Sequence, residues 1–193
     1  MAGDLIFRSL KAPSRRSFVL STSVRSLEAI TDKHLPVPGE VFKFISLRGG
    51  VASLSFIKWV ADHAPIEELH ASTLRIGPKQ YAYLNAMANA GRLKAARFVT
   101  STMQKDMDGR RGPNYAKEFA AIAARHGWRV TVINNHSKVI LMRTAAAHYV
   151  LETSSNLNEN PKIEQYSFEN NQELYEFYLH FFDKLEKKAA DGR

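Results

Sequence analysis

The alternation of short strand-type segments with longer helix-type segments constrains the fold of this chain more than any other feature. Residues 95–100 form an apolar run of strand composition, and residues 115–126 then show a helical pattern. In that pattern Phe119, Ile122 and Ala123 fall on one face, as they do in a helix that packs against a core. Strands that alternate with helices of this length are typical of an α/β layered domain, with a mixed β-sheet flanked by helices.

The same patterns predict the elements along the whole chain. We predict strands at residues 17–21, 41–46, 68–76, 95–100, 128–133, 136–142 and 148–153. We predict helices at residues 26–33, 53–62, 78–90, 115–126 and 172–188, and a polar loop at residues 101–113. We expect residues 1–15 to be a flexible basic tail and residues 16–193 to form one domain.

Two features of the composition exclude whole classes of protein. The chain has no cysteine, which excludes disulfides, thiolate zinc fingers, Fe–S clusters and cysteine nucleophiles and fits a reducing compartment. No apolar run approaches the roughly 18 residues that a membrane-spanning helix needs, and the N-terminal residues lack the apolar stretch of a signal peptide. We therefore expect a cytoplasmic protein with no membrane partner.

The charge is unevenly distributed. Lys and Arg number 27 against 19 acidic residues, a net charge of +8, and residues 1–150 hold 22 of the basic residues but only 10 of the acidic ones. A basic body favours polyanionic partners such as nucleic acid, although a basic protein without such a partner is the alternative. The basic residues that could line a nucleic-acid groove, or equally form a solvated surface, are Arg92, Lys94, Arg97, Lys105, Arg110 and Arg111.

The residues with catalytic potential lie between positions 136 and 164. His136 and Lys138 are two residues apart, so they share a face if they lie on a strand. Ser154 and Asn156 share a face too if the strand predicted at 148–153 runs that far, and a hairpin loop centred on Ala145 would set His136 directly opposite Ser154. An imidazole, an ammonium, a hydroxyl and a carboxamide would then converge on one patch, whereas a shift of one residue would scatter them.

These groups suit chemistry on a phosphoryl group. Lys138 supplies a positive charge, and Ser154 and Asn156 supply neutral donors for the phosphate oxygens. His136 can attack phosphorus or transfer protons, and Glu164 can hold the far imidazole nitrogen. No carboxylate cluster accompanies them, which favours covalent chemistry over metal-assisted chemistry, so we expect no metal and no cofactor. The alternative is a solvent-facing pair at 136 and 138, a turn at 154–156 and a surface charge at 164.

His136-Ser-Lys138, then Thr153-Ser-Ser-Asn156, then Glu164, resembles the HKD motif of the phospholipase D superfamily. In that motif H-x-K is followed by a G-S-x-N segment and a glutamate, and the resemblance is to compact members with one motif per chain. The family's aspartate, five residues after the lysine, falls on Arg143, and its glycine falls on Thr153. In the family the aspartate supports the structure of the motif more than it touches the phosphate, so the chemical groups are all present here.

The resemblance implies a metal-independent phosphodiesterase, most specifically a nuclease, that works through a phosphohistidine at His136. A second histidine must protonate the leaving oxygen, and since the chain has one motif, it must come from the other subunit of a homodimer. We expect nucleic acid as the partner, and DNA rather than RNA. The rival hypothesis is a catalytically silent nucleic-acid-binding protein on the same fold, and a lipid phosphodiesterase ranks third.

Overall fold

The structure is a computed structural model, and it describes residues 15–21, 34–47, 51–102, 115–158 and 162–191. The helix predicted at 26–33 and most of the loop predicted at 101–113 lie outside the described residues. The strands are β1 (Arg15–Ser21), β2 (Glu40–Ser46), β3 (Ile66–Ser72), β4 (Leu93–Ser101), β5 (Arg129–Ile133), β6 (Val139–Arg143), β7 (His148–Thr153) and β8 (Glu164–Asn170). The helices are α1 (Ser53–His63), α2 (Pro78–Asn89), α4 (Tyr115–Arg125) and α5 (Gln172–Ala190).

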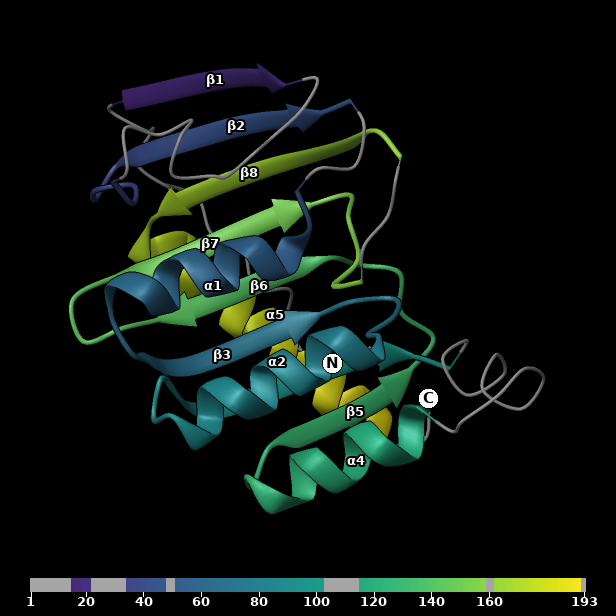
Figure 1. Cartoon of the computed structure of the whole chain (residues 1–193). Coiled ribbons are helices and arrows are strands. Elements are labelled where there is room, and N and C mark those ends of the chain that lie inside the picture. The colour runs from purple at the N-terminus through teal and green to yellow at the C-terminus, as the bar shows by residue number, and fades with distance from the viewer. Residues whose placement is uncertain (1–14, 22–33, 48–50, 103–114, 159–161, 192–193) are drawn as a thin grey trace.

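The described strands form one mixed sheet in the order β1-β2-β8-β7-β6-β3-β4-β5 (Figure 1). The pairs β1–β2, β3–β4 and β4–β5 are parallel, and the pairs from β2 through β8, β7 and β6 to β3 are antiparallel. Six strands therefore end at the edge of the sheet where β6 and β8 begin, and we call this the catalytic edge because residues expected to be catalytic lie there. His136 lies just before β6, and Glu164 opens β8, so both lie at this edge.

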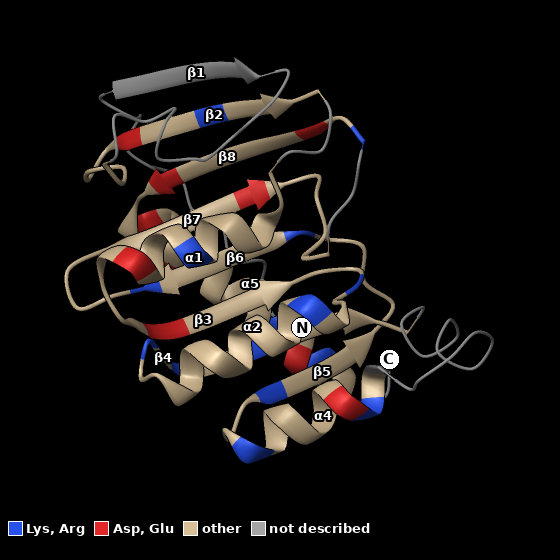
Figure 2. Ribbon diagram, in the orientation of Figure 1, with Lys and Arg blue, Asp and Glu red and all other residues tan. Residues whose placement is uncertain are grey.

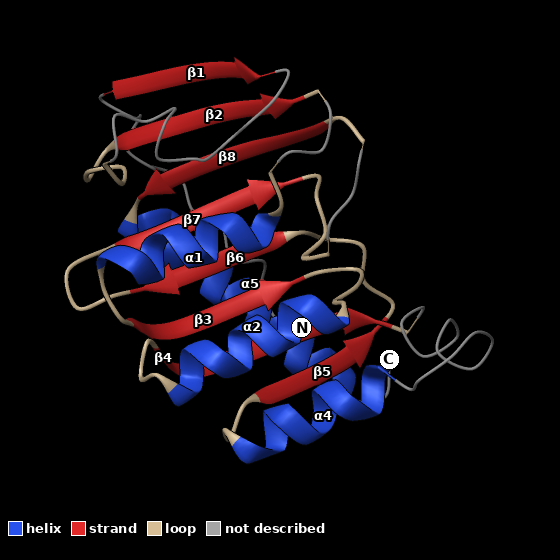
Figure 3. Cartoon of the chain, in the orientation of Figure 1, coloured by secondary structure: helices blue, strands red, loops and turns tan. Residues whose placement is uncertain are grey.

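Helices cover both faces of the sheet, so the chain has the layered α/β architecture that the alternating segments predicted (Figure 3). Helices α1, α2 and α4 lie on one face, and α5 lies on the other. The larger core lies on the first face and includes Phe56, Trp59 and Phe168. The smaller core packs Tyr175 and Phe182 of α5 against the sheet. None of the described helices is long and apolar enough to cross a membrane.

Strand β8 was not predicted, and it lies between β2 and β7 near the middle of the antiparallel part of the sheet. Its sequence is Glu-Gln-Tyr-Ser-Phe-Glu-Asn, in which Tyr166 and Phe168 point into the larger core. Gln165 and Ser167 alternate with them on the opposite face, where Ser167 pairs with Lys43 of β2. The strand thus has the expected period of two, but its two apolar residues are too few to stand out in the sequence.

The β6–β7 hairpin differs by one residue from the predicted register. Arg143 pairs with His148 and Val139 with Glu152, so the strand partner of Lys138 is Thr153, which donates its backbone N–H to the Lys138 carbonyl at 3.2 Å. The turn holds the four residues 144–147, and the Thr144 hydroxyl accepts the backbone N–H groups of residues 146 and 147, at 3.4 and 3.1 Å. The prediction that His136 lies opposite Ser154 is therefore wrong, and His136 precedes β6 instead of lying on it.

Candidate active site

His136 and Lys138 contact each other in the segment that leads into β6. The Lys138 Nζ atom donates to the His136 carbonyl oxygen at 2.9 Å and lies 3.3 Å from Nδ1 of the imidazole. His136 is exposed and Lys138 is half-buried. Partial burial lowers the pKa of Lys138 below its ordinary value, and the negative charge of Glu164 opposes that shift. An ammonium placed beside an exposed imidazole can hold an anionic group next to the ring.

Ser154 and Glu164 form a second pair at the same edge. Glu164 is 5% exposed, and its carboxylate accepts a hydrogen bond from the Ser154 hydroxyl. The Ser154 Oγ atom also accepts the backbone N–H of Gln165 at 3.1 Å, which fixes its position. We expected Glu164 to hold the far nitrogen of His136. In the structure the imidazole contacts Lys138 instead. Glu164 accepts a hydrogen bond from Ser154, and its negative charge raises the pKa of Lys138.

Asn156 is held by the loop that follows β3. Its Oδ1 atom accepts the backbone N–H of Leu74 at 3.2 Å. Leu157 is held in the same way, because its N–H donates to the Thr73 hydroxyl at 3.1 Å. With its oxygen occupied by the backbone, the Asn156 carboxamide presents its NH2 group as a donor, which is the group that a phosphate oxygen requires.

Helices α1 and α2 begin at the catalytic edge near residues 154–158. The hydroxyl of Ser53, the first residue of α1, donates to the carbonyl oxygen of Ser155 at 3.1 Å. Gly77 precedes α2, and a Cβ atom added there would lie 3.7 Å from Cβ of Asn158. Neither helix has an acidic residue in its first turn or a side-chain hydrogen bond at its N-cap. The positive ends of both helix dipoles therefore favour an anion near residues 154–158.

Arg143, at the position where the resembled motif has an aspartate, is the last residue of β6, whereas Lys138 lies just before its first residue. Its guanidinium donates to the Glu68 carboxylate at 2.6 Å, and Glu68 is its cross-strand partner on β3. This ion pair lies near the end of β6, away from the catalytic edge. The side chain at this position is therefore paired with Glu68.

The predicted nucleic-acid groove is not supported at the residues that the structure describes. Arg92 pairs with Asp62, and Lys94 pairs with Glu67 at 2.8 Å, both at the start of β4 and hence at the edge opposite His136. Arg97 is 3% exposed and bonds to His70 and to carboxylates of α5. Its side chain is therefore structural, contrary to the prediction. Lys105, Arg110 and Arg111 lie outside the described residues. Lys and Arg are found near both edges of the sheet (Figure 2).

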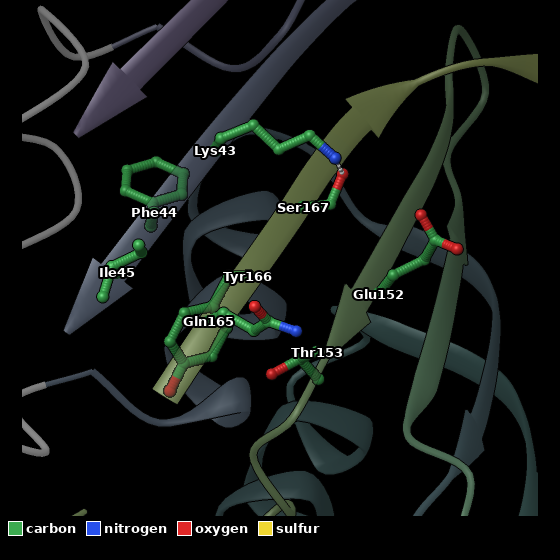
Figure 4. A pocket seen from close by; sticks show the side chains of 8 residues that line it. All are labelled: Lys43, Phe44, Ile45, Glu152, Thr153, Gln165, Tyr166 and Ser167. Carbon is green, nitrogen blue, oxygen red and sulfur yellow. Dashed lines mark hydrogen bonds between the residues drawn. The ribbon is translucent and has the colours of Figure 1, made fainter. Parts of the chain in front are cut away.

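A pocket of about 370 Å³ lies over β2, β8 and β7 (Figure 4). Lys43 reaches across it and donates to the Ser167 hydroxyl at 2.6 Å. Thr153 and Gln165 are also in its lining, and they are the direct chain neighbours of Ser154 and Glu164. His136 and Lys138 do not line this pocket, so it adjoins the candidate site without containing its reactive groups.

Sequence reasoning missed a polar cluster behind His136, formed by Ser72, Asn135 and Ser137. The signal available in the sequence was the pair of asparagines at 134 and 135, directly before the H-x-K motif. Among the described residues, no group of three or more His, Asp or Glu side chains is arranged to hold a metal ion.

Comparisons with known proteins find similarity in structure but not in sequence. No family model matches the chain, and no curated protein is similar to it in sequence. The phospholipase D family member Nuc from Salmonella typhimurium superposes with a TM-score of 0.50 at 16% identity, over 76% of this chain and 93% of Nuc. Phosphatidylserine synthase from Haemophilus influenzae superposes with a TM-score of 0.53 at 10% identity, over 77% of this chain. The archaeal chromatin protein TrmBL2 gives 0.51 at 9% identity, over 76% of this chain.

The chain spans 39% of the synthase and 53% of TrmBL2, but nearly the whole of Nuc. At these identities the similarity concerns the fold alone. The chain therefore shares the layered α/β fold of these structures, the phospholipase D family member Nuc among them, and this is the fold that we expected.

Proposed function

We propose that the protein is a metal-independent phosphodiesterase that cleaves nucleic acid through a covalent intermediate on His136. The observation that carries this proposal is the contact between the Lys138 ammonium and the exposed His136 imidazole, at the edge where α1 and α2 begin. Lys138, the NH2 group of Asn156 and the helix ends supply positive potential for the non-bridging oxygens of a phosphodiester. The exposed imidazole supplies the nucleophile.

The reaction has two steps. In the first, an imidazole nitrogen of His136 forms a bond to phosphorus while the bond from phosphorus to one strand's oxygen breaks, and that oxygen takes a proton. In the second, water attacks phosphorus, loses a proton to a base and displaces the imidazole. One group must donate the first proton and accept the second, and a second histidine suits both roles.

The second histidine would come from another copy of the chain. Each chain has a single H-x-K motif, so a two-fold dimer would place the partner subunit's His136 across the same phosphate. In support of this, His136 and Ser154 are both exposed at the catalytic edge. The homodimer is therefore part of the proposal, because the site is incomplete without it.

The second candidate is a protein that binds nucleic acid on this fold without cleaving it. The observation that favours it is the structural similarity to TrmBL2, whose structure shows a mode of DNA binding. The net charge of +8 suits either function.

A cleavage assay in EDTA separates the two candidates. Plasmid DNA, single-stranded DNA and RNA are incubated with the wild-type protein, with His136→Ala and with His180→Ala, which changes an exposed histidine of α5. The proposal predicts cleavage by the wild type and by His180→Ala but not by His136→Ala. Equal cleavage by His136→Ala would overturn the role of that residue. Salt-sensitive binding without cleavage by the wild type would favour the second candidate.

A further inference from the structure

The segment that carries His136 crosses the ends of two strands. It leaves β5 after Ile133 and enters β6 at Val139, and in the sheet β4 and β3 lie between these strands. Residues 134–137 therefore pass over the catalytic edge outside the ladder of strand hydrogen bonds, which the chain rejoins at Lys138, whose carbonyl accepts the backbone N–H of Thr153. A segment outside the ladder needs other contacts to hold one conformation.

Asn135 supplies the contacts to the two strands that are crossed. Its side chain is almost completely buried, at 7% exposed. The Nδ2 atom donates to Ser72 Oγ at the end of β3, at 3.0 Å. It also lies 3.4 Å from the carbonyl oxygen of Thr73 and 3.5 Å from that of Val99 on β4. One amide group thus ties the crossing segment to both strands.

The other side of the same carboxamide holds the residue after His136. Asn135 Oδ1 accepts from the backbone N–H of Ser137 at 3.0 Å and from its hydroxyl at 2.6 Å. The hydroxyls of Ser72 and Ser137 lie 2.6 Å apart. Protons can therefore be assigned in a closed ring, in which Asn135 donates to Ser72, Ser72 to Ser137 and Ser137 to Asn135. Each bond in such a ring polarises the next, and every member is satisfied.

We propose that Asn135 is a positioning residue for His136, and that the ring of Ser72, Asn135 and Ser137 holds the imidazole beside Lys138. The ring fixes the residues on both sides of His136 while leaving the imidazole itself exposed. A nucleophile must be held close to the line of attack, and a displacement of about 1 Å can cost roughly 100-fold in rate. This inference rests on the proposed function, since it concerns the same histidine.

The test compares Asn135→Ala with Asn85→Ala. Asn85 serves as the control, because it is a half-buried asparagine outside the candidate site whose Oδ1 atom lies 2.8 Å from His126 Nε2. For metal-free cleavage of an oligonucleotide, Asn135→Ala should lower kcat by roughly 10- to 100-fold with KM within about three-fold of the wild type. Asn85→Ala should lower the melting temperature without lowering kcat. An unchanged kcat in folded Asn135→Ala would overturn the proposal.

A second pair of variants covers the case in which Asn135→Ala does not fold. Ser137 is only half-buried, so Ser137→Ala removes one hydroxyl from the ring at little structural cost, and Ser137→Thr restores a hydroxyl. We expect kcat to fall in the first and to recover at least partly in the second. Equal values in both would overturn the role of the ring.

Hydrogen exchange of the Ser137 amide separates failure of this inference from failure of the proposed function. The amide should exchange faster in Asn135→Ala than in the wild type, because its acceptor is lost. If the wild type cleaves no phosphodiester at all, the proposed function fails. Unchanged exchange in that variant would then refute the ring independently of any activity.

Discussion

Lys138 is the residue whose charge the proposed chemistry needs most directly. Its Nζ atom lies beside the His136 imidazole, where it would meet the phosphate oxygens as negative charge builds on them. We expect Lys138→Ala to lower kcat/KM by roughly 100- to 1,000-fold, as loss of an electrostatic donor does elsewhere, while leaving the fold intact. Steady-state kinetics in EDTA measures this, with Lys58→Ala on the exposed side of α1 as the control. A rate equal to that of the wild type would refute the phosphate role.

Substitution of Arg143 tests whether the residue at the motif's aspartate position affects activity. The Arg143 hydrogen bond lowers the pKa of Glu68, so the pair is intact above the unfolded pKa of Glu68 and is lost as the pH falls through its folded pKa. Arg143→Asp would set two carboxylates opposite each other. Both side chains are about one-third exposed, so solvent limits the loss to about 0.5–1 kcal/mol.

Urea denaturation at neutral pH should show that small loss of stability, and the metal-free cleavage rate should stay within about two-fold of the wild type. Glu68→Lys in the same chain should restore the stability by pairing with the new carboxylate. A large loss of activity in Arg143→Asp with a normal melting temperature would show that this position acts on the catalytic edge after all.

The residue types of the candidate site could be predicted from the sequence, but their arrangement could not. The order of His136, Lys138, Ser154, Asn156 and Glu164 is visible in the chain. The register of β6 against β7 depends on whether the turn between them holds an odd or an even number of residues. The structure has four residues there, held by the Thr144 hydroxyl, and the apolar pattern does not show this. The ring behind His136 joins positions 63 and 65 residues apart, which only the folded sheet brings together.

At the scale of elements, helix α5 is attached to the sheet by a buried polar network. Arg97 of β4 donates from Nε to His70 Nδ1 at 2.8 Å and from Nη1 to Asp183 of α5 at 2.6 Å, and its guanidinium lies 5.5 Å from the centre of the Phe182 ring. Burial lowers the pKa of His70 to about 4, and the positive charge of Arg97 acts in the same direction. The helix is thus held by a histidine that stays neutral at physiological pH.

This histidine predicts a pH dependence of stability. The pKa of His70 is about 4 in the folded protein against 6.5 as its ordinary value. Between these values the unfolded chain binds a proton that the folded one does not, so stability falls as the pH falls from 6.5 to 4, by up to about 3 kcal/mol from this residue. In denaturation at several pH values, His70→Gln should flatten that slope and His180→Gln should not. Equal slopes in His70→Gln and wild type would contradict the pKa.

The helices could be predicted because their apolar residues recur at helical spacing along the sequence. α5 was expected at residues 172–188 and extends from Gln172 to Ala190, and α1 and α2 differ from prediction by one residue. The strand predicted at 68–76 runs instead over Ile66–Ser72, because Thr73 and Leu74 turn away to hold Leu157 and Asn156. Strand β8 was missed because its alternating pattern is mostly polar. Strand ends at the catalytic edge are set by contacts between distant segments, which local patterns do not show.

At the scale of the whole molecule, the proposal requires two chains. Light scattering at micromolar concentration should give a mass near twice the 21.8 kDa of the chain. When subunits are allowed to exchange, an excess of His136→Ala should lower the activity of the wild type by more than dilution does, because each mixed dimer lacks one of its two imidazoles. A strict monomer that retains cleavage would exclude the composite site.

The most direct test is to trap the covalent intermediate. A strand carrying a radioactive phosphate at the scissile position is mixed with the protein in EDTA, and the reaction is stopped with denaturant within the first turnover. The account predicts that the label stays attached to the protein through a nitrogen–phosphorus bond, that peptide mapping places it on His136, and that His136→Ala carries none. Cleavage of the strand with the label on another residue, or on no residue at all, would contradict it.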